Sequence, residues 1–508
     1  MRARERGAAA LLLVSACLVA PLAQASPAFE LVGSAFGDGG LNARATGSNA
    51  ASAYFNPALL AGARQSLALG WVILRDDIDI TLYARQPSAD VPVLALNTFQ
   101  GQLPSLPTAW LEAGCDPVRG GRCASALTPR PRQGAGTSGE THAYQALGLV
   151  SHAIERYLTV GLYALVPFDA LVTGQTFFAD EREQYFSNSL HPELYSDRLS
   201  ALSFALSAGS QVFDWLALGI GAALSLKTVA DAGTYVGNSA RISETLQLST
   251  KLSVPLGVSP FFGAVLTPLA GLDVSLTVHT PQEMELDMAV STFLPNGDLQ
   301  RARRRQTFDW LPWTLGTGVQ YDFVRSPAHV LGAVATIMYR FWSDYVDRQG
   351  ERPRQGYEWS NTFQFGLGLR HRFEQRLASY ADFAYEPTPV PAQTGRSNYV
   401  DNDKLTFAAG LNYEIPRAIS SASLRLGVQA QLQLLLERAH TKLDPKSPAF
   451  AGRQFSQLVI DEWADDAKDN RGATIPEAAG LQTNNPGWPG FSSKGTIFSA
   501  GASAALLY

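Results

Sequence analysis

The chain has 508 residues, of which 46% are apolar and 17% charged, and its formal net charge is −5. This mildly acidic balance argues against a nucleic-acid-binding protein, because it offers no basic surface for phosphates. Beyond residue 25 no apolar run approaches the ~18 residues that a membrane-spanning helix needs. The many apolar residues must therefore be distributed in another pattern.

The first 25 residues have the order of parts of a secretory signal peptide. Three arginines within Arg2–Arg6 precede an apolar run, Ala8–Ala20, and the small residues Ala23–Ala25 offer a cleavage site. A buried N-terminal helix and a lipoprotein cleavage site at Cys17 are the alternatives, although the apolar run continues past Cys17. The sequence predicts an exported protein whose signal peptide covers residues 1–25.

Residues 26–64 are rich in Gly, Ala, Ser and Asn but also carry large apolar side chains, among them Phe29 and Leu31. Small residues allow close backbone packing, which a flexible linker does not need. Asn56-Pro57-Ala58 combines a helix cap with a proline at the first helical position, which predicts a short helix or turn. We predict that residues 26–64 form a compact hatch, with a flexible linker as the alternative.

From residue 65 to the end, apolar and polar residues alternate in segments of ten or more residues. A strand has a side-chain period of two, so each segment has one apolar and one polar face. We predict about fourteen strands from this alternation. They lie near 65–83, 144–154, 157–177, 199–211, 215–228, 258–268, 271–290, 306–323, 328–346, 357–373, 377–386, 404–415, 421–441 and 494–508.

Strands of this length match the thickness of a hydrocarbon layer when tilted, and in lipid their sheet must close on itself. The predicted fold is therefore an all-β, transmembrane antiparallel barrel over residues 65–508, in the outer membrane. The long polar stretches at 86–142, 178–198, 229–257 and 442–493 are expected to be loops, mostly extracellular. An acidic run, Asp461–Asp466, is expected to be solvated loop rather than a calcium site.

Only two cysteines, Cys115 and Cys123, remain after the signal peptide. In an oxidising compartment the pair predicts a disulfide within a loop. A metal site is the alternative, but no further Cys or His flanks the pair, and we expect no metal.

Three places in the sequence resemble the FadL-type long-chain fatty acid and hydrocarbon transporters of the Gram-negative outer membrane. They are Phe29-x-Leu31 with the small-residue run ending in Asn56-Pro57-Ala58-Leu59, then Phe341-Trp342-Ser343-Asp344-Tyr345, then Tyr385–Gln393 followed by Asp401-Asn402-Asp403-Lys404. Their order, together with the aromatic C-terminal residue Tyr508, makes the likeness span the whole mature chain.

The resemblance implies a monomeric fourteen-stranded barrel whose lumen is plugged by the N-terminal hatch. A hydrophobic ligand would be captured by extracellular loops, pass to a lumen site beside the hatch, and leave sideways through a gap in the wall. It also implies outer-membrane lipid, lipopolysaccharide and the barrel assembly machinery as partners. No cofactor is implied.

The resemblance also suggests residues for the site. Phe29 and Leu31 would lie at the ligand, and Asn56-Pro57-Ala58 would gate it, or only shape a turn. Pro167, followed by Phe168, would mark the kink of the third strand, because proline lacks the amide hydrogen of a ladder bond. An ordinary strand-end proline is the alternative, and Asp169 stands where the family often has glycine.

A carboxylate head group would need a cationic partner. Lys227, Arg340 and Arg348 are the candidates, although none matches a basic position of the family. Lumen charges that neutralise one another are the alternative.

Three other functions are weighed against transport. A barrel enzyme such as a lipase would need a Ser–His pair, but the seven histidines stand in no recognisable nucleophile motif. A general porin conflicts with a hatch that carries large apolar residues. A structural or adhesive barrel would place the function in the long loops. The sequence favours a transporter that is not an enzyme.

Overall fold

The computed structural model describes the chain from residue 28 onward, with gaps. Described are residues 28–83, 135–154, 157–168, 191–192, 202–225, 228–236, 246–255, 257–293, 299–347, 350, 352–353, 358–374, 376–394, 397–419, 421–442, 487 and 490–508. The predicted signal peptide, the Cys115–Cys123 pair, Lys227, Arg348 and the Asp461–Asp466 run lie outside the described residues.

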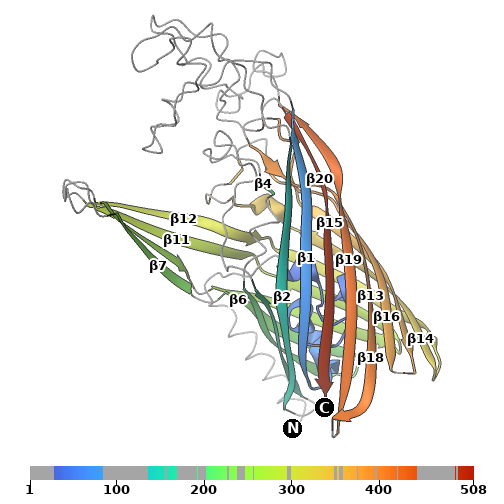
Figure 1. Ribbon diagram of the computed structural model, residues 1–508. Helices are drawn as coiled ribbons and strands as arrows, with labels where there is room; N and C mark the ends of the chain where they lie inside the picture. The colour runs from blue at the N-terminus through green and yellow to red at the C-terminus, as the bar shows by residue number, and fades with distance from the viewer. Residues whose placement is uncertain are drawn as a thin grey trace, which may run out of the picture.

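Fourteen antiparallel strands form a closed barrel, in the order β1-β2-β3-β5-β6-β9-β10-β13-β14-β15-β16-β18-β19-β20 (Figure 1). Their bounds are β1 Ser66–Leu82, β2 Ala135–Ile154, β3 Leu158–Pro167, β5 Ser203–Phe213, β6 Leu216–Ser225, β9 Gly257–Leu269, β10 Leu272–His279, β13 Thr314–Arg325, β14 His329–Arg340, β15 Thr362–Phe373, β16 Leu377–Glu386, β18 Lys404–Ile419, β19 Ala422–Thr441 and β20 Gly490–Leu507. The predicted fold class is confirmed.

The first and last strands close the barrel. β1 pairs with β20 from Ser66↔Leu507 to Leu82↔Phe491, and the Tyr508 amide donates to the Gln65 carbonyl at 2.9 Å. The start of β1 and the end of β20 therefore lie at one rim, which is the periplasmic rim of a barrel with an even strand number.

The outward face of the wall is apolar. In β1, Leu67, Leu69, Trp71 and Ile73 are exposed and alternate with buried residues. β15 repeats the pattern with exposed Phe363, Phe365, Leu367 and Leu369. Apolar side chains that point away from a closed barrel are suited to lipid, so the alternation seen in the sequence sets the lipid face.

Four barrel strands continue into a second sheet, of order β12-β11-β8-β7. It consists of β7 Thr228–Val236, β8 Leu246–Val254, β11 Gln282–Phe293 and β12 Leu299–Leu311, and it projects sideways from the barrel (Figure 1). These strands adjoin β6, β9, β10 and β13 in sequence.

This sheet corrects three of the predicted boundaries. The segments 271–290 and 306–323 are not single strands, since Pro281 and Pro312 each separate a barrel strand from an outer one. Proline cannot donate a ladder hydrogen bond, so the strand ends there. The predicted loop 229–257 contains β7 and β8 instead.

The helices are short: α2 Ala28–Val32, η2 Gly40–Asn42, α3 Ser52–Phe55, η3 Pro57–Gly62 and η6 Trp342–Asp344. In the described part of the chain no helix combines the length and apolarity required to cross a membrane. Two further short strands, β4 His191–Pro192 and β17 Tyr399–Val400, pair in parallel.

Residues 28–63, which we call the hatch, pack against the inward face of the wall on several sides. A methyl group added at Gly148 of β2 would meet Phe36 and Ala50, one at Gly318 of β13 would meet Ala45, and one at Gly427 of β19 would meet the Phe36 carbonyl. Hatch residues thus contact strands around the circumference, so the segment lies within the lumen.

Candidate functional site

The start of the hatch docks on β3 through aromatic rings. Phe29 is fully buried in α2, and its ring centroid lies 4.8 Å from that of Tyr163 in a stacked arrangement. Tyr54 of α3 packs against the same Phe29 ring at 4.5 Å. Leu31 is also buried, and its carbonyl accepts a hydrogen bond from Gln431 Nε2 at 2.7 Å. Phe29 therefore lies between the hatch core and the wall.

The hydroxyl of Tyr163 fixes the chain that follows α2. It donates to the Gly33 carbonyl at 3.1 Å and accepts from the Ala35 amide at 3.3 Å. A tyrosine hydroxyl is neutral and can both donate and accept a hydrogen bond. Tyr163 is thus one of the wall residues that bind the backbone of the hatch, and it does so on both sides of Ser34.

The turn of the hatch rests on a row of glycines. Gly209, Gly219 and Gly263 lie opposite one another on β5, β6 and β9. A methyl group added at any of them would overlap Asn56 or Pro57. Because these glycines have no side chain, the backbone of η3 can pack directly against the backbone of the wall.

Asn56 caps η3, as its residue type predicts. Its Oδ1 accepts from the Ala58 amide at 3.1 Å, and its Nδ2 donates to the Arg44 carbonyl at 2.9 Å. Ala58 packs with Ala217 and Val265 of the wall. The Asn56-Pro57-Ala58 turn therefore contacts β5, β6 and β9, while Leu60 and Ala53 are the hatch residues that face Gly161 of β3.

Pro167 is the last residue of β3 and is buried. The ladder between β3 and β5 runs from Thr159↔Gly209 to Leu165↔Ser203, whereas the ladder to β2 continues to Pro167↔Tyr144. Within the described residues, β5 therefore offers no partner to Val166 or Pro167. The next residue, Phe168, is 62% exposed, and its amide donates to the Ala143 carbonyl of β2 at 2.8 Å.

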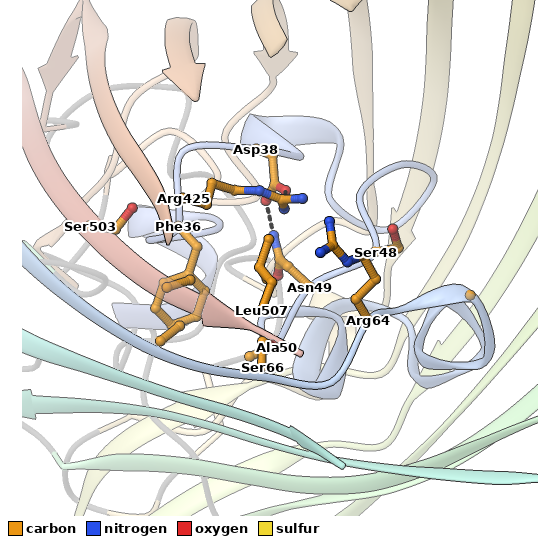
Figure 2. A pocket seen from close by; sticks show the side chains of 13 residues that line it. Phe36, Asp38, Ser48, Asn49, Ala50, Arg64, Ser66, Arg425, Ser503 and Leu507 are labelled. Atoms are coloured by element: carbon orange, nitrogen blue, oxygen red, sulfur yellow. Dashed lines mark hydrogen bonds and ion pairs between the residues drawn. The ribbon is translucent and has the colours of Figure 1, made fainter. Parts of the chain in front are cut away.

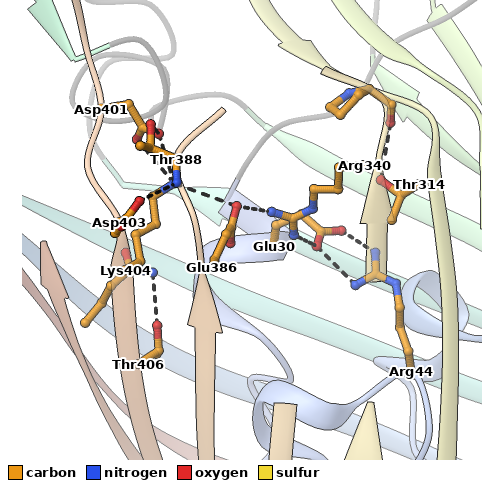
Figure 3. Close-up of polar contacts among 12 residues, drawn as sticks. Glu30, Arg44, Thr314, Arg340, Glu386, Thr388, Asp401, Asp403, Lys404 and Thr406 are labelled. Atoms are coloured by element: carbon orange, nitrogen blue, oxygen red, sulfur yellow. Dashed lines mark hydrogen bonds and ion pairs between the residues drawn. The ribbon is translucent and has the colours of Figure 1, made fainter. Parts of the chain in front are cut away.

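A chain of ion pairs joins the hatch to the extracellular ends of β14, β16 and β18 (Figure 3). Glu30 of α2 accepts from Arg44 at 2.5 Å and from Arg340 at 3.3 Å. Arg340 also pairs closely with Glu386, and Lys404 lies 3.7 Å from Glu386. Arg340 is therefore held by two carboxylates.

Glu30 is kept ionised by this arrangement. Burial alone would raise its pKa, but the guanidinium groups of Arg44 and Arg340 hold the pKa of the carboxyl well below its usual range. Its neighbour Tyr54 donates to Glu30 Oε1 at 2.7 Å, and burial together with this carboxylate raises the pKa of the phenol. The network thus contains a fixed negative charge on the hatch.

A cavity of about 80 Å³ lies beside this network. Its walls come from the hatch and from the inward faces of β14, β15, β16, β18 and β19. Its apolar lining residues are Leu31, Leu41, Phe55, Leu311, Met338 and Trp342, and its polar ones include Glu30, Arg44, Arg340, Glu386, Lys404, Gln364, Gln431 and Gln433. Of the residues proposed from the sequence for ligand binding, Leu31 and Arg340 line it, and Trp342, Glu386 and Lys404 come from the motifs that carry the resemblance.

An aromatic cluster stands next to the cavity. Trp342 lies 5.9 Å from Trp310 and 5.5 Å from Trp359, and Tyr345 stacks on Trp359 at 3.5 Å. Tyr399 packs edge-on against the last two rings. The buried rings of the Trp342–Tyr345 motif therefore lie at the extracellular end of the cavity.

A second cavity, of about 110 Å³, lies at the periplasmic end of the hatch (Figure 2). Asp38, Arg64 and Arg425 are the charged residues of its lining, which also contains apolar side chains such as Phe36 and Leu507. Arg425 pairs with Asp38 at 3.6 Å, and Glu414, beside the cavity, pairs with Arg425 at 3.3 Å and with Arg64 at 2.7 Å. The periplasmic cavity therefore contains a charged network.

The fold was compared with known proteins. Over 95% of this chain and 98% of the other, it is similar to the crystal structure of a Pseudomonas aeruginosa FadL homologue, with a TM-score of 0.51 and 16% identity. The chain has the FadL fold. No family model and no curated protein sequence matches it.

Two other solved structures are similar to this FadL fold at lower scores. The Pseudomonas putida toluene transporter TodX has a TM-score of 0.48 and 11% identity, over 93% of this chain and 98% of that one. The Ralstonia pickettii toluene transporter TbuX has a TM-score of 0.40 and 12% identity, over 96% of this chain and all (100%) of that one.

Two features of the site were missed in the sequence. Tyr163 and Leu165 face the lumen, although they continue the apolar character of β3, and the glycine row on β5, β6 and β9 has no sequence pattern that distinguishes it from ordinary strand. A barrel strand that is apolar on both faces indicates a contact within the lumen, and that signal was present in Leu158–Pro167.

Proposed function

We propose that this protein takes up hydrophobic compounds across the outer membrane. Ligand captured at the extracellular loops enters the cavity beside Trp342, and the hatch controls its passage. It then leaves sideways through the wall between β3 and β5, above Leu165, into the lipid. In this proposal the protein acts as a monomer, with lipid and lipopolysaccharide around it, after insertion by the barrel assembly machinery.

One observation carries the proposal: the start of the hatch is tied to β3 by Phe29 and Tyr163, on the strand whose ladder to β5, among the described residues, extends only to Leu165. A movement of the hatch away from Tyr163 would therefore change the wall beside Val166 and Pro167. The apolar ligand gains nothing by passing on to the polar periplasmic cavity around Arg425, since water and charge are poor surroundings for it. Sideways exit keeps it in apolar contact.

The alternatives fit these contacts less well. An open porin needs a water-filled lumen, whereas the hatch meets the wall on several sides. We also propose that the protein is not an enzyme. Among the buried histidines of the described residues, His279 stacks on Phe261, His440 accepts from the Gln393 amide and His142 lies 3.7 Å from Glu140. These contacts differ from the Ser–His pair that a lipase-like enzyme would use.

The experiment is uptake of labelled oleate and labelled toluene by a FadL-deficient Gram-negative host that expresses the chain. Uptake above that of the empty vector, for at least one ligand, is expected. If neither ligand enters faster when correctly folded barrel is present in the outer membrane, the proposal is wrong.

Gating by the hatch has its own test, a disulfide between Ala53→Cys and Gly161→Cys. A β-carbon built at Gly161 lies 3.1 Å from that of Ala53, a little nearer than the ~3.5–4.5 Å of a disulfide, so a small shift of the hatch brings the pair to bonding geometry. The other contact there is the end of the Leu60 side chain. Oxidised double variant should lose uptake and regain it on reduction, while each single variant transports in both conditions. Equal uptake in the two redox states would refute gating and leave transport itself intact.

A further inference from the structure

The cations that line the cavity beside Trp342 are already neutralised. Arg44 binds Glu30 through two hydrogen bonds of 3.1 and 2.5 Å, Arg340 is shared by Glu30 and Glu386, and Lys404 lies 3.2 Å from Asp401. Three cations thus face three carboxylates. A fourth negative charge brought into this cavity would lose its hydration without gaining an unshared cation.

The same lining contains neutral polar atoms that have no hydrogen-bond partner among the described residues. They are the indole Nε1 of Trp342 and the side-chain oxygens of Gln364 and Gln433. Arg44 Nε also has no partner there, but it belongs to the guanidinium whose charge Glu30 neutralises. Trp342 is 1% exposed and Gln433 is 7% exposed, so solvent does not readily supply the missing bonds. Buried polar groups in folded proteins are nearly always paired, so these atoms need an explanation.

The unpaired atoms include donors and acceptors. The indole N–H can only donate, whereas the two glutamine oxygens accept. A hydroxyl group can do both, and it carries no charge. The rest of the lining is apolar, with Leu41, Phe55 and Met338 among its residues.

We propose that this cavity selects an uncharged hydrophobe bearing one neutral hydrogen-bonding group, such as a phenol or alcohol, and discriminates against carboxylates. This rests on the proposed function, and it names the ligand class of that site. The specificity comes from Glu30 and Glu386, which occupy the cations, and from Trp342 and the glutamines, which receive the neutral group.

The test uses three probes that share a para-methylphenyl body: 4-methylphenol, p-xylene and 4-methylbenzoate. Binding to the purified full-length protein in detergent is measured by calorimetry at neutral pH, where only the benzoate is charged. We expect 4-methylphenol to bind about tenfold more tightly than p-xylene, as one or two buried hydrogen bonds would give. The benzoate should bind more weakly than both.

Two variants assign the effect to residues. Glu386→Gln releases Arg340 and Lys404 from one carboxylate, so benzoate affinity should rise about tenfold while p-xylene affinity changes little. Trp342→Phe keeps the ring and removes the N–H, so the preference for 4-methylphenol over p-xylene should shrink. Glu414→Gln, which removes the partner of Arg64 and Arg425 beside the periplasmic cavity, is the matched control and should leave all three affinities unchanged.

The outcomes separate this inference from the function beneath it. Benzoate binding as tight as that of 4-methylphenol would overturn the inference, and toluene or oleate uptake would still support transport. Failure of all three probes to bind would also overturn it. The uptake experiment in cells would then show separately whether the protein is a transporter. If Glu386→Gln does not fold, the inference is tested by the order of the three affinities in the wild type and by their change in Trp342→Phe.

Discussion

Phe29 and Tyr163 are the point at which the hatch meets the third strand of the wall. Their rings stack at 4.8 Å, and the Tyr163 hydroxyl bonds to the backbone at Gly33 and Ala35. Four residues beyond Tyr163, the strand ends at Pro167. The position of α2 and the pairing of β3 are therefore linked through one side chain.

Replacing Tyr163 with Phe tests how firmly the hatch is held. The variant keeps the ring stack but leaves the buried Gly33 carbonyl and Ala35 amide without their partner, which costs about 1–3 kcal/mol of docking free energy. We expect faster hydrogen exchange at Ala35 and faster proteolysis of the hatch, with unchanged heat-modifiable mobility of the barrel. Tyr321→Phe, at an exposed position, is the control. Unaltered exchange at Ala35 would show that the hydroxyl does not hold the hatch.

Gly219→Ala tests the glycine row beneath the hatch. The added methyl group would overlap the Pro57 backbone, and such overpacking typically costs about 1–3 kcal/mol. The expected result is a hatch that is cleaved more readily in a barrel that still folds. Gly62→Ala is the matched control, since a methyl group there meets nothing within 4 Å. Equal protease resistance of the two variants would contradict the packing role of the row.

The barrel could be predicted from the sequence because lipid imposes a simple rule on each strand. Alternation such as that of Leu67, Leu69 and Trp71 identifies an outward face wherever the inward face is polar. The rule stops applying beyond the hydrocarbon layer. There β7 mixes apolar and polar residues on both faces, and Pro281 and Pro312 interrupt segments that otherwise read as continuous strands. The sequence of β8 does alternate, with Leu246, Leu248, Leu252 and Val254 at even-numbered positions, but it lies in a stretch that was expected to be a loop.

The site was less predictable because its contacts join distant parts of the chain. Asn56 and Pro57 are recognisable as a cap and a turn, but the glycines that receive them lie on three other strands. Arg340 was selected as a cation for a ligand, yet its partners Glu30 and Glu386 become neighbours only in the closed barrel. No local pattern encodes such a pairing.

Glu30 gives the hatch a defined pH dependence. Its pKa is lowered in the fold, so its ion pairs contribute fully above the ordinary carboxyl value of 4.5 and are lost as the pH falls from there toward the lowered pKa. We expect hatch protection against exchange to be constant from neutral pH down to about that value and to decline below it. Glu30→Gln should be less protected at neutral pH and should lack this decline. A decline already at pH 6 in the wild type would point to another group.

Pro167 removes a donor on one side of β3 only. The Phe168 amide points toward β2, where it donates to the Ala143 carbonyl. Amides of successive strand residues point in opposite directions, so the N–H that Pro167 lacks belongs to the β5 side. Among the described residues the ladder to β5 extends only to Leu165, and the missing donor therefore lies on the side of the proposed exit.

Pro167→Ala restores that donor, so the β3–β5 ladder can extend and narrow the proposed opening in the wall. One added backbone hydrogen bond contributes about 0.5–1.5 kcal/mol, which predicts a loss of uptake of roughly two- to tenfold. Initial rates of toluene or oleate uptake, normalised to folded barrel, measure the effect. Pro416→Ala makes the same chemical change near the periplasmic end of β18 and should leave the rate unchanged. Equal rates for wild type and Pro167→Ala would exclude this position as the exit, and the ligand path would have to cross the wall elsewhere.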